Sequence, residues 1–327
     1  MENTEVITST GEVVSETEVR EPSVRVVPPQ PVKPDRTGNV KRTENILGWV
    51  YISPMVIGLL LFTLVPLIMS IIGMFYVWDP KYSLFSAKAA GFDNFKQIFG
   101  GANSDLYWKS FGNTLIFAIQ LPVGMVLGLF LALAMNRDMK GVQTFRVLYY
   151  IPCVMSVVAV SIVWQKLFGA GGTIDTLFHN RMLDNPGGIY FVINLFLIWK
   201  GIGYTTLMFI AGLQSVSTDQ IEAAKIDGAN SWIILLKITL PALYDTIFYL
   251  FVTGLMGALQ MFNETFLILG ESGGFQQSGL TVVGFVYYFK GQGNIGLSSV
   301  AAWVLAIFIF IITAIQMYVD KKKQEAS

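Results

Sequence analysis

Long apolar runs with almost no charged residues recur along this chain from about residue 47 onward. A helix needs about 20 apolar residues to cross the ~30 Å hydrocarbon core, whereas barrel strands are about 10 residues long and alternate. Six runs are long enough for a spanning helix: about 47–77, 111–136, 147–165, 189–214, 246–269 and 297–319. The pattern predicts an all-α integral membrane protein with six transmembrane helices.

The ends of the chain differ from this pattern. Residues 1–45 have no apolar period and contain several prolines between Val26 and Pro34, which favour an extended backbone. We therefore expect a disordered tail over 1–45, a six-helix transmembrane domain over 46–320 and a short basic tail over 321–327.

The connections between the runs differ in Lys and Arg, which gather on the cytoplasmic side of membrane proteins. Cations precede the first run, follow the second and fourth, and end the chain at Lys321, Lys322 and Lys323. With six spans these segments all fall on one side. The sequence therefore predicts a multi-pass membrane protein with both termini in the cytoplasm.

Composition supports a membrane protein and excludes several other classes. Hydrophobic residues make up 53% of the chain and charged residues 13%, about half the charged share of a soluble domain. The net charge of zero gives no basic field for nucleic acid. A single cysteine, Cys153, and a single histidine, His179, exclude a disulfide framework and a Cys- or His-built metal site.

Small residues recur every four positions in the second run, at Gly124, Gly128 and Ala132. Such a stripe lets two membrane helices approach closely. We interpret it as a helix-packing surface.

The connection at about 215–244 predicts a compact helix–turn–helix on the cytoplasmic side. Ser217 with Gln220, or Asp219 with Glu222, can cap the first helix, and Gly228 suits its left-handed end. Ser231 can cap a second helix over 232–240.

The first helix of this connection presents a carboxylate beside two small residues, Glu222, Ala223 and Ala224. Alanines permit close approach and a carboxylate can pair with a cation, which suits docking into a cleft of another protein. The alternative is an amphipathic helix that lies on the membrane surface.

These residues also carry a resemblance. The pattern Glu222-Ala223-Ala224, Gly228, Ile238 and Leu240-Pro241 is similar to the signature loop of binding-protein-dependent ABC importer permeases. Segments 92–95, 145–152, 211–214 and 301–303 resemble the sugar-uptake branch, which contains maltose and glycerol-phosphate permeases.

The resemblance implies a mechanism in which the loop docks into a cytoplasmic ATPase. The residues implied in this coupling are Glu222, Ala223, Ala224, Asp227, Gly228 and Pro241. It also implies a second permease subunit as heterodimer partner, two ATPase subunits that bind ATP and Mg, and an extracellular or periplasmic sugar-binding protein. The resemblance places this assembly in the lipid of the bacterial plasma membrane.

The chain lacks a nucleotide site of its own by sequence. Gly291 to Gly296 fits G-x-G-x-x-G, but no strand is expected before it, and no P-loop motif occurs. We therefore expect a transporter subunit that is not an enzyme and binds no cofactor or metal itself.

Polar residues inside the spans are candidates for substrate binding, because they are costly there. The candidates are Lys200, Tyr204, Gln260, Asn263 and Glu264. Lys200 can face a wet cavity or extend to the membrane surface. Gln260 and Asn263 can bind sugar hydroxyls or bond neighbouring helices.

Three alternatives compete with a sugar permease. An ion-coupled secondary transporter would need discontinuous helices and midplane carboxylates, and no such acidic pair is evident. An ABC permease for another solute, such as glycerol phosphate, uses the same loop. A membrane-embedded enzyme lacks a His, Asp and Glu constellation.

Overall fold

The computed structural model describes residues 37–79, 81–82, 87–136, 141–179 and 181–325. Residues 1–36 of the predicted disordered tail lie outside it, as do 326–327. The prediction is wrong for residues 37–45, which form the start of helix α1 (Thr37–Leu59). Lys321 to Lys323 also belong to a helix, the end of α16 (Ile295–Gln324).

The chain divides into two parts, residues 1–60 and 61–327. The described first part is α1, whose side chains from Asn45 onward are mostly exposed and apolar, as a lipid-facing helix requires. Along the chain, a π-helical turn, η1 (Leu60–Leu64), lies between α1 and α2 (Val65–Gly73). Pro54 lies inside α1 and Pro66 near the start of α2.

The second part is almost entirely helical. After α2 its α-helices are α3 (Asp93–Phe99), α4 (Ser104–Ala118), α5 (Gln120–Met135), α6 (Val142–Val154), α7 (Val157–Phe168), α8 (Thr173–Phe178), α9 (Pro186–Leu213), α10 (Thr218–Ile226), α11 (Ser231–Ile234), α12 (Leu240–Ala242), α13 (Tyr244–Leu259), α14 (Asn263–Leu269), α15 (Val282–Gly291) and α16. A short antiparallel pair, β1 (Tyr76–Val77) and β2 (Lys88–Ala89), places Tyr76 opposite Ala89.

Five helices of the described chain are long and apolar enough to cross a membrane: Asn45–Gly73, Ser104–Met135, Val157–Phe178, Pro186–Leu213 and Ile295–Gln324. A sixth span is counted when Ser231–Ala242 and Tyr244–Leu259, which meet at 67°, are joined. The predicted all-α membrane fold is confirmed.

Two predicted spans are broken in the structure. The run 147–165 is interrupted where α6 ends at Val154 and α7 begins at Val157, because Met155 adopts an extended backbone with ψ of 146°. The run 246–269 is interrupted between Leu259 and Asn263. Thr281 Oγ1 donates to Met261 O at 2.8 Å and Thr265 Oγ1 to Phe262 O at 3.1 Å. Phe262 O also accepts from Phe266 N at 3.0 Å. The bond from Thr281 satisfies the Met261 carbonyl, which the break leaves without a helical partner.

The stripe of small residues lies on the buried face of α5, and its central residue, Gly128, packs against α9. Gly124, Gly128 and Ala132 are all buried. A Cβ at Gly128 would lie 2.8 Å from Thr205 Cγ2 and 3.3 Å from Thr206 N. The two backbones can approach this closely because Gly128 has no side chain.

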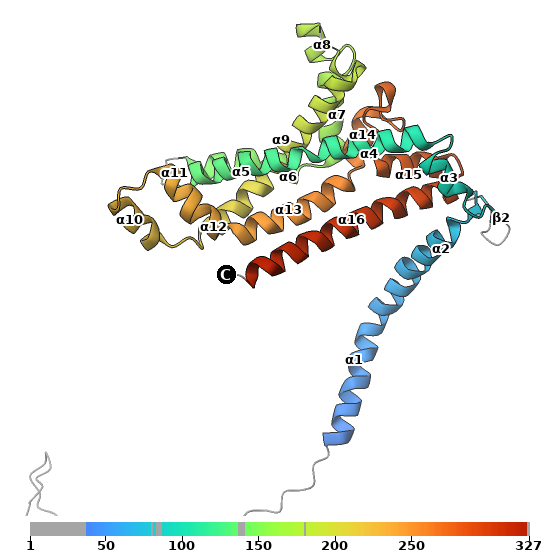
Figure 1. Ribbon diagram of the computed structural model, residues 1–327, viewed down its shortest axis with the longest axis horizontal. Coiled ribbons are helices and arrows are strands. Elements are labelled where there is room, and N and C mark those ends of the chain that lie inside the picture. Colours follow the sequence, from blue (N-terminus) through green and yellow to red (C-terminus); the bar gives the residue numbers. More distant parts are fainter. Residues whose placement is uncertain (1–36, 80, 83–86, 137–140, 180, 326–327) are drawn as a thin grey trace, which may run out of the picture. The chain divides into compact units, whose positions relative to one another are not determined.

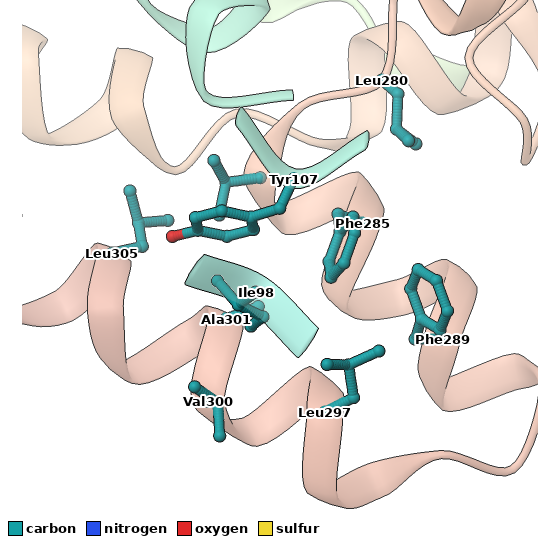
Figure 2. Close-up of a cluster of buried hydrophobic side chains, with 10 residues drawn as sticks. Ile98, Tyr107, Leu280, Phe285, Phe289, Leu297, Val300, Ala301 and Leu305 are labelled. Carbon is teal, nitrogen blue, oxygen red and sulfur yellow. The ribbon is translucent and has the colours of Figure 1, made fainter. Parts of the chain in front are cut away.

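An aromatic and aliphatic cluster joins α3, α4, α15 and α16 (Figure 2). Tyr107 packs edge-on against Phe285 with ring centroids 5.4 Å apart, and Ile98 and Leu297 are fully buried beside them. This cluster connects the N-terminal half of the second part to its last helix.

Within residues 61–327, the helices α10 to α12 lie at the same end as the C-terminus of α16 (Figure 1). The elements α3, α14 and α15 lie toward the other end. The connection over residues 215–244 and the C-terminal cations therefore lie at the same end of the bundle.

Candidate functional site

The connection over residues 215–244 is called the signature loop below, and its first helix, α10, is capped at both ends. Ser217 Oγ accepts a hydrogen bond from Gln220 N at 3.4 Å, so the first of the two predicted caps is present. At the other end, Gly228 has φ of +81°. Gly228 N donates to Lys225 O at 3.1 Å and Ala229 N to Ala224 O at 2.9 Å. These two bonds form a Schellman motif, which requires a left-handed residue at Gly228.

The second half of the signature loop differs from the prediction. Asn230, and not Ser231, caps it, because Asn230 Oδ1 accepts from Ile233 N at 2.9 Å. The predicted single helix over 232–240 is α11, a π-helical turn over Leu235–Thr239, and α12, which contains Pro241. A Pro lacks the amide hydrogen that a regular helix would use, so the irregular turn precedes it.

Apolar side chains anchor the signature loop to the membrane helices. Val216 and Leu243 belong to a buried cluster with Phe209 and Leu213 of α9. Ile221 of α10 and Ile238 pack against the same cluster. Packed side chains therefore connect α10 to α5, α9 and α13.

The opposite side of the signature loop is open. Glu222 and Ala223 are exposed, and Glu222 has no ion-pair partner among the described residues. Ile226 is 86% exposed and Trp232 62%. Large apolar side chains beside a free carboxylate indicate a protein-binding surface.

A cavity of about 410 Å³ lies between α5, α6, α9, α13 and α14. Its size falls in the range of small-molecule sites. Four of the five candidate substrate residues line it: Lys200, Gln260, Asn263 and Glu264. Gln120, Cys153 and Phe262 also line it, and sequence reasoning did not assign them to a site.

Lys200 and Glu264 form an ion pair in this cavity, with Lys200 Nζ 3.3 Å from Glu264 Oε1. Their side chains are 24% and 19% exposed. Lys200 thus faces the cavity, which is one of the two predicted alternatives. The pairing with Glu264 was missed, because no local signal links residues that lie 64 positions apart.

The break between α13 and α14 places three further side chains at the cavity. Gln260 and Phe262 lie in the non-helical segment, with φ of −100° and −145°, and Asn263 begins α14. The side-chain amides of Gln260 and Asn263 make no hydrogen bond to any described residue. The predicted alternative of helix–helix bonding is therefore not observed for them.

Tyr204 lies outside this cavity. It lines a smaller one of about 210 Å³ with Met125 and Thr253, and Gly254 borders both cavities. Its hydroxyl lies 3.4 Å from the hydroxyl of Tyr249.

Another cavity, of about 590 Å³, lies where the loops after α7 and α14 meet. Gln165, Asp184 and Phe275 line it, and none of the sequence candidates is among its described lining residues. We place the candidate substrate site in the cavity of about 410 Å³, because this cavity contains both the Lys200–Glu264 ion pair and the unbonded amides of Gln260 and Asn263.

The G-x-G-x-x-G segment begins at the last residue of helix α15, and Asn294 within it caps α16 by accepting from Leu297 N at 3.1 Å. No group of three or more His, Cys, Asp and Glu that could hold a metal occurs among the described residues.

Comparison with known proteins decides the family. Residues 124–325, which contain the signature loop and most of the cavity, match the binding-protein-dependent transport system inner membrane component. The chain belongs to this family. The ABC permease family favours an ATP-driven importer over the ion-coupled alternative, and its members are multi-pass proteins of the inner membrane.

Relatives of this ABC permease align over most of its length. It is 33% identical to the probable ABC transporter permease protein YesP of Bacillus subtilis, over 84% of this chain and 90% of YesP. It is 26% identical to the lactose transport system permease protein LacF of Rhizobium radiobacter, over 88% of this chain and 98% of LacF.

The fold of this permease has a solved counterpart. A chain of a bacterial ABC transporter involved in the import of the acidic polysaccharide alginate superposes with a TM-score of 0.73. The match covers 87% of this chain and 98% of that one at 22% identity. This likeness establishes the shared fold.

Proposed function

We propose that this permease is a membrane subunit of an ABC importer for a sugar or oligosaccharide. The observation that carries the proposal is the signature loop, which is anchored by Ile221 and exposes Glu222 in a family of binding-protein-dependent permeases. Relatives named for lactose and for multiple sugars support the substrate class.

The signature loop couples transport to a separate ATPase. Ala223 and the exposed Ile226 let α10 enter a cleft, and Glu222 pairs with a basic residue there. Gly228 sets the bend and Pro241 the direction of the return helix. Asp227, exposed beside Gly228, adds a second carboxylate to the contact. ATP and Mg bind to the ATPase subunits.

The cavity beside Lys200 and Glu264 is the substrate site of this subunit. Amides such as Gln260 and Asn263 bind hydroxyl groups as both donors and acceptors. Phe262 offers a ring on the cavity wall that can stack on a sugar face. Tyr204, in the adjoining cavity, extends the site toward the signature loop.

The full importer contains partners that this chain lacks. We expect a second permease as heterodimer partner, two ATPase subunits and an extracellular or periplasmic sugar-binding protein. The signature loop and both termini lie in the cytoplasm, which the C-terminal cations Lys321 to Lys323 favour.

A charge reversal tests the coupling role. We expect Glu222→Lys to lower ATP-driven uptake at least tenfold and to reduce co-purification of the ATPase subunits. Asp105→Lys, an exposed carboxylate at the start of α4, is the matched control and should leave both unchanged. Full uptake in Glu222→Lys would contradict the coupling role, and uptake without any ATPase subunit would favour a secondary transporter.

A further inference from the structure

The charges in the substrate cavity are balanced. Lys200 and Glu264 are the charged residues among its described lining, and they face each other at 3.3 Å. The other polar side chains that line it, Gln120, Gln260 and Asn263, are uncharged amides. The cavity therefore has no surplus charge to offer a charged ligand.

A hydroxyl group can enter such a pair without disturbing its charge. It accepts a hydrogen bond from the Lys200 ammonium and donates one to the Glu264 carboxylate. Both charged groups keep a partner, and charge-assisted bonds are stronger than neutral ones. A saccharide with neighbouring hydroxyls can make both contacts at once.

A carboxylate or phosphate meets a different situation. It accepts hydrogen bonds but cannot donate to Glu264, so it must take Lys200 away from Glu264. Glu264, whose side chain is 19% exposed, would then be left without its cation and beside a second negative charge. Like charges at this depth repel strongly because water screens them poorly.

We propose that the Lys200–Glu264 pair selects uncharged, hydroxyl-bearing saccharides and rejects uronates and sugar phosphates. This inference rests on the proposed role of the cavity as the substrate site. It is not dictated by the fold, since the solved counterpart belongs to a transporter of an acidic polysaccharide.

The test measures ligand binding to the assembled permease pair with its ATPases in lipid nanodiscs, without the binding protein, whose own selectivity would otherwise act first. The probes are digalacturonate and its dimethyl ester, in which a methyl group on each carboxyl removes its charge and the sugar hydroxyls are unchanged. Saturation-transfer NMR reads the dissociation constant of each. We expect the wild type to bind the ester at least tenfold more tightly.

Substitutions in the pair should change this ratio in a defined order. Glu264→Gln keeps the shape and leaves Lys200 unpaired, so the preference should shift by at least tenfold toward digalacturonate. The double variant Lys200→Gln/Glu264→Gln is neutral and should fall between the two. Glu271→Gln, an exposed carboxylate outside the cavity, is the matched control and should behave as the wild type.

The outcomes separate the two proposals. Equal binding of both probes by the wild type, or one ratio in all variants, would overturn charge selection while leaving a sugar-binding cavity in place. Binding of neither probe to the wild type would overturn the substrate role of the cavity itself. Should Glu264→Gln fail to assemble, the ratio in the double variant decides.

Discussion

The ammonium of Lys200 in the middle of α9 lies 3.3 Å from the carboxylate of Glu264 in the first turn of α14. This pair joins a continuous helix to the short helix that follows the break at residues 260–262. It balances the charges in the cavity of about 410 Å³ and links α9 to α14.

Breaking the pair from one side should cost more stability than removing both charges. A single Glu264→Gln leaves Lys200 without its partner, and we expect a loss of about 1–3 kcal/mol, less than for a fully buried pair. The double variant Lys200→Gln/Glu264→Gln should recover part of this loss. Thermal unfolding in detergent ranks the stabilities of the wild type, the two single variants and the double variant. If the loss in the double variant equalled the sum of the two single losses, Lys200 and Glu264 would not interact.

Gly128 should tolerate no side chain. In Gly128→Ala the new Cβ would meet Thr205 and Thr206 of α9, and overpacking of this kind costs about 1–3 kcal/mol. Gly124→Ala is the matched control on the same helix, since nothing lies within 4 Å of its added Cβ. Equal unfolding midpoints for the two variants would contradict the close contact of α5 and α9.

Gly228 should be required because of its left-handed backbone conformation, and not because neighbouring atoms leave no room for a side chain. Its φ of +81° costs an alanine about 1–2 kcal/mol, although no atom lies within 4 Å of the added Cβ. We expect Gly228→Ala to lower ATP-driven uptake several-fold. Gly228→Asn should retain more activity, because Asn tolerates this conformation better. If both variants transported alike, strain at Gly228 would not be the cause.

Asn113 should hold the segment before α15 in place. Its side-chain nitrogen donates to Gln277 O and Leu280 O, both at 2.9 Å, and its oxygen accepts from the Tyr190 hydroxyl at 2.8 Å. Each such bond contributes about 0.5–1.5 kcal/mol. We expect Asn113→Ala to destabilise the protein two- to threefold more, in free energy of unfolding, than Tyr190→Phe, which removes only one of the three bonds. Similar losses would disprove this role.

The signature loop could be predicted from the sequence in most respects, because its signals are local. Ser217 precedes a short helical segment, and Gly228 follows it at a spacing that fits a left-handed cap. The cap of the second helix was misplaced by one residue, since Asn230 and Ser231 are both good caps and only the tertiary structure chooses between them.

The helix breaks could not be predicted in the same way. Residues 260–262 contain no Pro or Gly, and the break depends on Thr281, which bonds the released carbonyl of Met261 from a distant segment. The cavity depends on this break. Sequence reasoning could therefore name Lys200 and Glu264 as unusual residues in a membrane span, but it could not bring them together.

Photo-crosslinking from α10 tests the central claim most directly. A benzophenone amino acid replaces Ile226, which is 86% exposed on the signature loop, in the importer within native membranes. The same replacement of Phe178, exposed on α8 and far from α10 in Figure 1, is the control. The account predicts a crosslink to the ATPase subunit from position 226 and none from position 178. Crosslinks from position 226 to lipid alone would contradict it.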